Sequence, residues 1–162
     1  MDAPLTLAAI GVIRSPFRQQ EGTPICPAAA EPADGTVEVL PPYRGALQDL
    51  AGFERIWLLY WFDRARPFSP LVVPYRDTIK RGLFATRAPA RPNPIGISAV
   101  RLVSVNLERG ELEVQGLDVL DGTPLLDLKP YIPEFDAFPL SRAGWMDEAR
   151  LGTHLADGRF ER

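Results

Sequence analysis

Hydrophobic residues along this chain gather in short runs, and proline-rich segments separate the runs. Residues 7–14 form the first run, which Ser15 and Pro16 close, and residues 35–40 alternate apolar and polar positions. The clearest run, within residues 54–63, has seven consecutive apolar side chains and therefore no polar face. These patterns predict β-strands, and a strand without a polar face is expected to be buried on both sides.

The second half of the chain repeats this pattern. A polar turn at residues 108–111 separates two runs, residues 97–107 and 112–117. In the second run apolar and polar residues alternate, which is typical of a half-exposed hairpin strand. Asp121-Gly122 is a strong turn signal, and residues 125–128, which are leucine except for Asp127, follow it. We therefore expect a hairpin and then another strand.

Few segments favour a helix. Residues 44–53 predict one or two helical turns, and residues 146–151 predict a short helix in a tail that otherwise has no period. Helices and strands do not alternate, so a parallel sheet is not expected. The predicted fold class is mainly all-β: a small antiparallel β-barrel with proline-rich loops and few short helices. A helix or a second subunit would cover the outer face of the apolar strand at residues 54–63.

The composition supports a single folded domain. The 17 prolines and 13 glycines make up about 19% of the 162 residues, and 46% of the residues are hydrophobic. Average proteins have about 12% proline plus glycine, and low-complexity disorder begins at about 25–30%. The chain is therefore expected to be a proline-rich globular domain rather than a disordered, collagen-like or coiled-coil protein.

Several other classes can be set aside. The longest apolar run, residues 56–62, is far shorter than the ~20 residues that span a bilayer. Asp2 stands where a secretion signal would carry positive charge, so we expect a cytoplasmic protein. Cys26 is the single cysteine and His154 the single histidine, so neither an intrachain disulfide nor a His/Cys metal site is expected.

The formal net charge of −3 is distributed unevenly. Residues 76–101 hold six basic residues against one acid, and residues 102–139 hold two basic residues against eight acids. A basic stretch of this kind can attract an anionic ligand even in an acidic protein. The alternative is a solvated surface whose charge the following segment balances.

Sequence motifs of the common nucleotide and nucleophile sites are absent. The chain has no glycine-rich dinucleotide motif, no phosphate-binding loop and no Gly-x-Ser-x-Gly. If the protein is an enzyme, its main task is to bind and position two partners.

The segment 87–96 is unusually rigid. Prolines at positions 89, 92 and 94 restrict its backbone, which lowers the entropic cost of presenting polar side chains to a ligand. Arg87 and Arg91 suit phosphate or carboxylate recognition, and Asn93 suits a base edge. The alternative is a rigid crossover whose arginines face water.

Three aspartates form a second cluster. Asp121 precedes a glycine, so turn formation is its favoured interpretation. Asp118 and Asp127 could accept hydrogen bonds from a ribose or an amine, and for these two the choice between ligand and structural role stays open.

Several phrases of the sequence, taken together and in order, resemble one known family. They are IGVIRSPF at 10–17, GFERIWLLYWF at 52–62, RGLFATR at 81–87, RPNPIG at 91–96, and LDVLDGTP at 117–124 followed by KPY at 129–131. They extend over roughly residues 7–136. In these features the chain resembles the TsaA/TrmO (YaeB-like) family of β-barrel S-adenosylmethionine-dependent tRNA methyltransferases.

The resemblance implies a barrel domain at residues 1–136 with a C-terminal extension at 137–162. It further implies that the protein binds S-adenosyl-L-methionine, forms a homodimer and acts on tRNA. The implied reaction is methylation of N6 of N6-threonylcarbamoyladenosine at tRNA position 37. Two alternatives stay open: a cofactor sensor or RNA-binding module without turnover, and a methyltransferase for another RNA or a small molecule.

Matching positions also carry family roles, although the resemblance identifies neither a catalytic residue nor a metal ligand. Asp63 stands where the family often has histidine, and its carboxylate would accept from the methionine amine. The loop at 25–27 would contact the cofactor, reached across the dimer. The residues implied to bind the cofactor are Ile25, Cys26, Pro27, Asp63, Arg64, Phe84, Ala85, Thr86, Arg87, Leu117 and Asp118. Those implied to bind the substrate are Arg91, Asn93, Lys129 and Tyr131.

Overall fold

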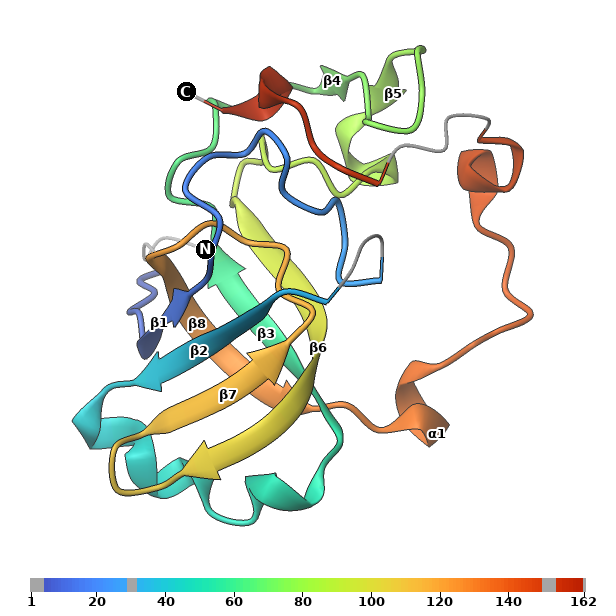
Figure 1. The fold of residues 1–162 in the computed structure, drawn as a ribbon. Coiled ribbons are helices and arrows are strands. Elements are labelled where there is room, and N and C mark those ends of the chain that lie inside the picture. The colour runs from blue at the N-terminus through green and yellow to red at the C-terminus, as the bar shows by residue number, and fades with distance from the viewer. Residues whose placement is uncertain (1–4, 29–31, 150–153, 162) are drawn as a thin grey trace.

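The computed structural model describes residues 5–28, 32–149 and 154–161. Within these residues, six antiparallel strands close into a barrel in the order β1-β2-β7-β6-β3-β8 (Figure 1). The antiparallel β-barrel predicted from the sequence is therefore confirmed. The strands are β1 (Gly11–Arg14), β2 (Asp34–Val39), β3 (Arg55–Trp61), β6 (Ile95–Asn106), β7 (Glu111–Gln115) and β8 (Thr123–Pro130).

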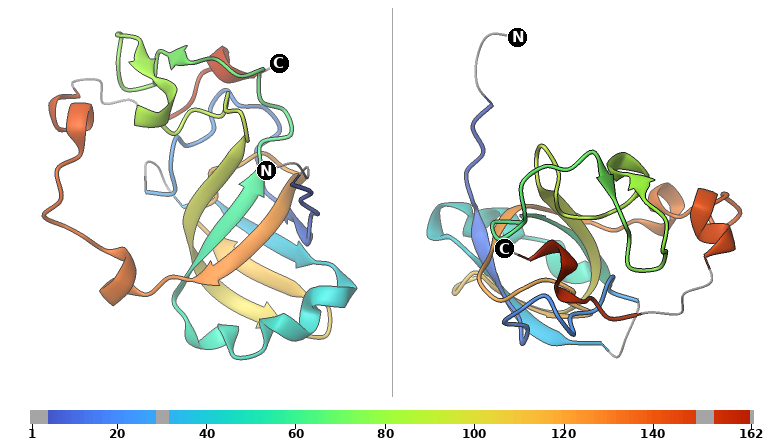
Figure 2. Two further views of the ribbon diagram at one scale, coloured as in Figure 1. Left: turned by 180° about the vertical axis from the view of Figure 1, so that it is seen from behind. Right: turned by 90° about the horizontal axis from the view of Figure 1, so that it is seen from above.

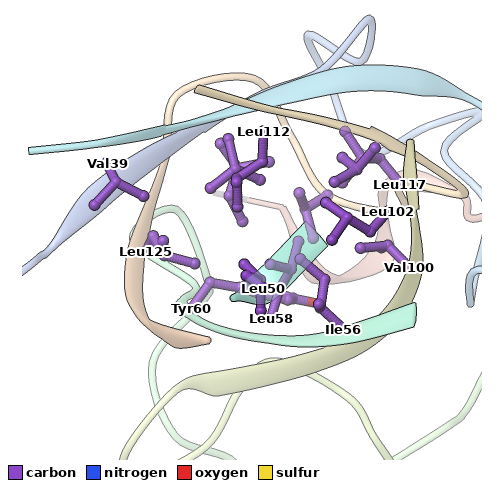
Figure 3. Close-up of a cluster of buried hydrophobic side chains, with 14 of the residues drawn as sticks. Val39, Leu50, Ile56, Leu58, Tyr60, Val100, Leu102, Leu112, Leu117 and Leu125 are labelled. Carbon is purple, nitrogen blue, oxygen red and sulfur yellow. The ribbon is translucent and has the colours of Figure 1, made fainter. Parts of the chain in front are cut away.

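Aliphatic side chains fill the inside of the barrel. Alternate residues of each strand point inward, which gives β3 and β7 their alternating burial. The labelled side chains in Figure 3 converge from different strands on one centre. The interior is thus a packed core rather than a channel. Its most buried members include Ile13, Val37, Ile56, Leu58, Val100, Leu112, Val114, Leu117 and Leu125.

The apolar strand β3 lies between β6 and β8, but it is not buried on both faces as predicted. Its outward side chains Trp57, Leu59 and Trp61 are half-buried. The Trp57 and Tyr131 rings are in contact, with their centroids 5.4 Å apart, and the Trp57 Nε1 donates to Asp136 Oδ2 at 3.1 Å. The short helix α1 (Pro133–Asp136) thus supplies part of the expected cover. Within one chain the outer face of β3 is therefore only half-buried, and cover by a second subunit stays a prediction.

Other element boundaries differ modestly from the prediction. Strand β1 begins only at Gly11, although the Ile10 amide already donates to the Leu125 carbonyl of β8 at 2.8 Å, and β6 begins two residues early, at Ile95. The helical turns expected at 44–53 are two 3₁₀ helices, η1 (Pro41–Leu47) and η2 (Leu50–Gly52). The helix expected at 146–151 is η4 (Gly144–Glu148), and part of the predicted range lies outside the described residues.

Each end of the barrel is covered differently. Helices η1 and η2 insert Leu47 and Leu50 into the core at the end where β6 finishes (Figure 1). At the end where β3 finishes, loops 15–28 and 62–94 and the tail 154–161 form a cover that we call the cap.

The cap contains little regular structure. It holds a two-stranded sheet, β4 (Leu71–Val72) with β5 (Arg81–Gly82), and two 3₁₀ helices, η3 (Leu83–Ala85) and η5 (Gly158–Phe160). It also has a small core of its own, formed by Val72, Leu83, Ala88 and Phe160 with Tyr75 against them.

Hydrogen bonds join the tail 154–161 to the two loops of the cap. The Ile25 amide donates to the His154 carbonyl at 3.0 Å, and the Ala156 amide donates to the Thr23 carbonyl at 2.7 Å. On the other side, the Arg66 Nε donates to the Glu161 carbonyl at 2.6 Å. The tail therefore links two cap loops that are far apart in sequence, as the view from above shows (Figure 2).

Candidate cofactor and acceptor site

A cavity of about 790 Å³ lies between the cap and the end of the barrel. The ends of β3 and β6 contribute Tyr60 and Gly96, the cap contributes Tyr75 and Phe160, and the segment before β8 contributes Asp118. Its volume is within the range of about 300–1,000 Å³ typical of small-molecule and cofactor sites. The cavity is therefore large enough for a nucleoside-sized ligand.

A chain of three polar side chains leads from the barrel interior to this cavity. Ser98 Oγ donates to Asp118 Oδ1 at 2.5 Å, and the Tyr60 hydroxyl lies 2.9 Å from Ser98 Oγ. A serine hydroxyl has one proton, so Tyr60 donates to Ser98 while Ser98 donates to Asp118. Gly96 pairs with Tyr60 across β3 and β6, and a Cβ at this position would collide with the Tyr60 ring. The glycine thus leaves the space that the tyrosine needs.

The surroundings change the acidity of both ends of this chain. Burial raises the pKa of the Asp118 carboxyl to about 6, although the Ser98 hydrogen bond and the Arg87 charge act in the opposite direction. Burial and the nearby Asp118 charge raise the pKa of Tyr60 well above its usual range. Tyr60 therefore stays protonated at neutral pH, and Asp118 titrates close to neutrality.

The loop after η3 forms one wall, and Arg91 organises it. The Arg91 Nη1 donates to the carbonyls of Thr86 and Ala88, at 3.0 and 3.3 Å, and lies 3.5 Å from that of Leu83. The Thr86 hydroxyl donates to the Leu83 carbonyl at 2.8 Å and accepts from the Ala88 amide at 3.2 Å. The expected rigidity of this segment thus comes from arginine and threonine bonds as well as from proline.

Asp63 and Arg64 line another wall at the end of β3. The Arg64 Nη2 donates to the Asp121 carbonyl at 2.8 Å, which fixes the guanidinium. The Arg64 Nε is buried and has no hydrogen-bond acceptor among the described residues, since the Asp63 carboxylate is 3.6 Å away. This site therefore presents a buried donor that a ligand oxygen would satisfy.

The other two aspartates of the sequence cluster have structural roles. Asp121 and Gly122 form a turn in which the Thr123 amide donates to the Leu120 carbonyl at 3.2 Å, as predicted, and the Asp121 carboxylate accepts from the Ser15 amide at 3.1 Å and pairs with Arg18. Asp127 lies on β8 and forms a 2.9 Å ion pair with Lys129.

The structure brings together most of the residues predicted for the site. Ile25 and Cys26 reach the cavity within a single chain. The predicted residues that line it are Ile25, Cys26, Asp63, Arg64, Phe84, Ala85, Thr86, Arg87, Arg91 and Asp118.

The other predicted residues lie elsewhere. Pro27 and Asn93 are outside the cavity lining, and Leu117 is buried in the barrel core. Lys129 pairs with Trp57 near the opposite end of β3, and the Tyr131 amide donates to the Arg55 carbonyl at 3.0 Å. Within one chain these two side chains are at the far end of the barrel, and their substrate role stays a prediction.

Sequence reasoning missed several residues of the site. The sequence patterns point to Tyr60 only as part of the apolar run, and they do not indicate that Tyr75, Trp145 and Phe160 line the cavity. One signal in the sequence could have indicated two of them. Trp145 and Phe160 are large aromatic residues in a segment without strand or helix periodicity.

The fold and site together are those of a ligand-binding β-barrel: a closed antiparallel barrel with a cofactor-sized cavity under its cap. The family model described as the tRNA-methyltransferase O N-terminal domain matches residues 12–137. The chain belongs to this family, as its sequence motifs predicted. The class is therefore that of the S-adenosyl-L-methionine-dependent methyltransferases built on this barrel.

Relatives and solved structures agree with this assignment. The "probable S-adenosyl-L-methionine-binding protein" of Pyrococcus abyssi is 49% identical over 154 residues, covering 93% of this chain and 82% of that protein. The tRNA (adenine(37)-N6)-methyltransferase of Escherichia coli is 36% identical over 148 residues, covering 86% of this chain. A crystal structure of TrmO from Pseudomonas aeruginosa matches 90% of this chain at 41% identity, with a TM-score of 0.74. The chain spans 63% of the E. coli enzyme and 64% of the P. aeruginosa TrmO chain.

The described residues contain neither a membrane-spanning helix nor a metal-binding cluster. In the described ranges, no helix has the length and hydrophobicity to cross a membrane. The same residues contain no group of three His, Cys, Asp or Glu side chains that could together hold a metal ion.

The cavity residues fit S-adenosyl-L-methionine. This cofactor has a carboxylate, an ammonium and a sulfonium, together with a ribose and an adenine ring. The buried Arg64 Nε and the exposed Arg87 are available donors for oxygen atoms, and Asp63 and Asp118 are acceptors for cationic groups. The aromatic rings of the cap supply apolar surface.

Proposed function

We propose that this protein transfers a methyl group from S-adenosyl-L-methionine to N6 of N6-threonylcarbamoyladenosine at position 37 of tRNA. The observation that carries the proposal is the position of Asp118, held by Ser98 in a cofactor-sized cavity beside Arg87. The relative in E. coli, a tRNA (adenine(37)-N6)-methyltransferase, supports the choice of acceptor.

Asp118 and Arg87 are proposed to hold the cofactor. The ionised Asp118 carboxylate would bind a cationic group, and Arg87 and the Arg64 Nε would bind oxygen atoms of the same molecule. When bound, S-adenosyl-L-methionine supplies an electrophilic methyl group. The protein aligns the acceptor nitrogen with it, so most of the rate enhancement comes from positioning.

The rigid wall around Arg91 is proposed to face the acceptor. Arg91 lines the cavity while its Nη1 is bonded to the loop carbonyls. The wall thus keeps its shape without a ligand, and little entropy is lost when the acceptor binds. Asn93, on the exposed side of the same loop, would contact the nucleotide next to the acceptor.

We also infer that two copies of the chain associate. Lys129 and Tyr131 match family positions near the acceptor, yet in one chain they lie at the end of the barrel away from the cavity. They would serve the acceptor only from a second copy. The exposed side chains Phe135, Phe138 and Leu140, which follow Tyr131, are available for such a contact.

The test of the activity uses labelled S-adenosyl-L-methionine and bulk tRNA from cells with and without the threonylcarbamoyl modification. We expect label only in the modified tRNA. Binding of the cofactor without transfer to any RNA would favour a sensor, and transfer to unmodified RNA would favour a different substrate.

The test of the cofactor site is calorimetry on Arg87→Ala. Loss of a charge-assisted hydrogen bond is expected to weaken cofactor binding about 10- to 100-fold. Arg109→Ala is the matched control, since Arg109 is exposed on the turn between β6 and β7. Unchanged affinity in Arg87→Ala would remove Arg87 from the site.

The test of the two-copy arrangement mixes two variants, each of which is expected to have little activity at a cofactor concentration that saturates only the wild type. Arg87→Ala lacks the cofactor site, and Lys129→Ala lacks the acceptor contact. If the second copy supplies Lys129, the refolded mixture recovers about a quarter of the wild-type activity, because half of the dimers are mixed and each has one intact site. No recovery, or a monomer by light scattering, would contradict the arrangement.

A further inference from the structure

Phe84 is a large apolar side chain left exposed at the mouth of the cavity. It is 78% exposed, although its neighbour Leu83 is only 2% exposed. The backbone around it is fixed by the Thr86 amide, which donates to the Leu83 carbonyl at 3.0 Å. The fold thus fixes the backbone at Phe84 without burying its ring, so core packing does not explain this residue.

A cation lies beside this ring. The Arg91 guanidinium is 5.5 Å from the Phe84 ring centroid, and hydrogen bonds to loop carbonyls hold it there. An arginine at this distance interacts favourably with an aromatic face. Since most of the ring is exposed, Phe84 also has surface available to a second planar group.

Trp145 lies in η4 (Gly144–Glu148), next to the same loop. Its Nε1 donates to the Ala85 carbonyl at 2.8 Å, and the Arg81 guanidinium lies 5.5 Å from its ring centroid. Arg81 is itself fixed by a 2.7 Å ion pair with Asp77. The matched family domain ends at residue 137. Trp145 lies beyond it, so this contact comes from a segment outside that domain.

We propose that Phe84 and Trp145, with Arg91 and Arg81, form a stacking platform for an unpaired RNA base next to the acceptor nucleotide. The proposal rests on the proposed function, since it supposes that the acceptor is a nucleotide of RNA. Single-stranded RNA is bound mainly by stacking of its bases on aromatic side chains and on guanidinium planes, with cations along its backbone. All four side chains line the cavity mouth or contact a residue that does.

The positive charges of Arg81 and Arg91 beside the two rings indicate which class of ligand the platform binds. Two guanidinium groups accompany the two rings, whereas an apolar peptide or a lipid tail would require a continuous hydrophobic surface without fixed cations. Rings interleaved with arginines match the alternating planar bases and anionic phosphates of a nucleic acid strand. Every base has a π-face, so the platform contributes affinity and position rather than sequence choice.

The test measures binding of fluorescein-labelled heptauridylate by anisotropy at fixed salt. Phe84→Ala is expected to weaken binding about 5- to 150-fold, the range found for loss of one stacked base. Phe84→Tyr keeps an aromatic face and is expected to stay close to wild type, and Trp145→Ala is expected to weaken binding as well. Phe53→Ala is the matched control, because Phe53 is an exposed phenylalanine at the other end of the barrel.

Three results would overturn the platform: Phe84→Ala within twofold of wild type, Phe84→Tyr as weak as Phe84→Ala, or an equal loss of cofactor affinity in Phe84→Ala. The last result would place Phe84 in the cofactor site instead. The proposed function is tested separately by methyl transfer in the wild-type protein. If RNA binding depends on Phe84 but no methyl group is transferred to tRNA, the platform is supported and the proposed function is rejected. If methyl transfer occurs but RNA binding does not depend on Phe84, the proposed function is supported and the platform is rejected.

Discussion

The barrel and the cap of this protein are built in opposite ways. The barrel is closed by regular strand pairing and filled with aliphatic side chains, whereas the cap consists of loops, 3₁₀ helices and a small core held by polar bonds. The cavity lies where the two regions meet, and each contributes part of it. The barrel therefore supplies a rigid base and the buried Tyr60–Ser98 pair, and the cap supplies the loops that surround a ligand.

The largest effect is expected from a cavity in the barrel core. Leu58 is fully buried, so Leu58→Ala should lower the free energy of unfolding by about 2–5 kcal/mol. Denaturant unfolding measures the loss, and Leu5→Ala, at a position 84% exposed, should stay within about 0.5 kcal/mol of wild type. A small effect at Leu58 would mean that the barrel core is looser than its packing indicates.

A smaller and local effect is expected in the cap. Phe160 contacts Tyr75 with ring centroids 5.3 Å apart, and Phe160→Ala should cost about 1–3 kcal/mol because the cap core is small. Hydrogen exchange should become faster in residues 62–76 and stay unchanged in β3 and β6. Equal acceleration in both regions would show that cap and barrel unfold as one unit.

Replacing Asp118 should make the protein more stable at neutral pH and remove cofactor binding. The pKa of Asp118 is raised from 3.8 to about 6, so between these values the folded chain binds this proton more readily than the unfolded chain. Stability therefore falls as the pH rises through that window. Asp118→Asn should be about 1–3 kcal/mol more stable at pH 7.5, and the difference should vanish near pH 4. A less stable variant at pH 7.5 would show that the charged carboxylate supports the fold.

The smallest effect on stability is expected at the far end of the barrel. Lys129 and Asp127 form an exposed ion pair, and Lys129→Ala should change the free energy of unfolding by less than about 0.5 kcal/mol. Methyl transfer should nevertheless fall if Lys129 serves the acceptor of a second copy. Full activity in Lys129→Ala would confine the site to one chain.

The difference between the barrel and the cap also explains how much of the structure could be predicted from the sequence. The sequence predicts the barrel strands because alternate residues of each strand point into the core. The alternation of apolar and polar residues at 112–117 corresponds to the alternating burial of β7. The full burial expected for β3 is not reached within one chain, where Trp57 and Trp61 are half-buried on the outer face. Periodicity thus identifies a strand, but it does not say what lies over its outer face.

The cap could not be predicted in this way. Its residues meet through long-range bonds that leave no local pattern, such as that between the Gln20 side chain and the Phe160 amide at 3.0 Å. Motif matching placed Arg87 and Asp118 at the cavity, because those positions share a family pattern. It did not find Trp145, which lies beyond the matched residues 12–137.

The most direct test of the central claim is the pH dependence of S-adenosyl-L-methionine binding by calorimetry. If the ionised Asp118 holds the cofactor, wild-type affinity should be about tenfold lower at pH 5 than at pH 7.5, because the pKa of this carboxyl is about 6. Asp118→Asn should bind weakly at both pH values. Equal wild-type affinity at the two pH values, or undiminished binding by Asp118→Asn, would contradict the claim.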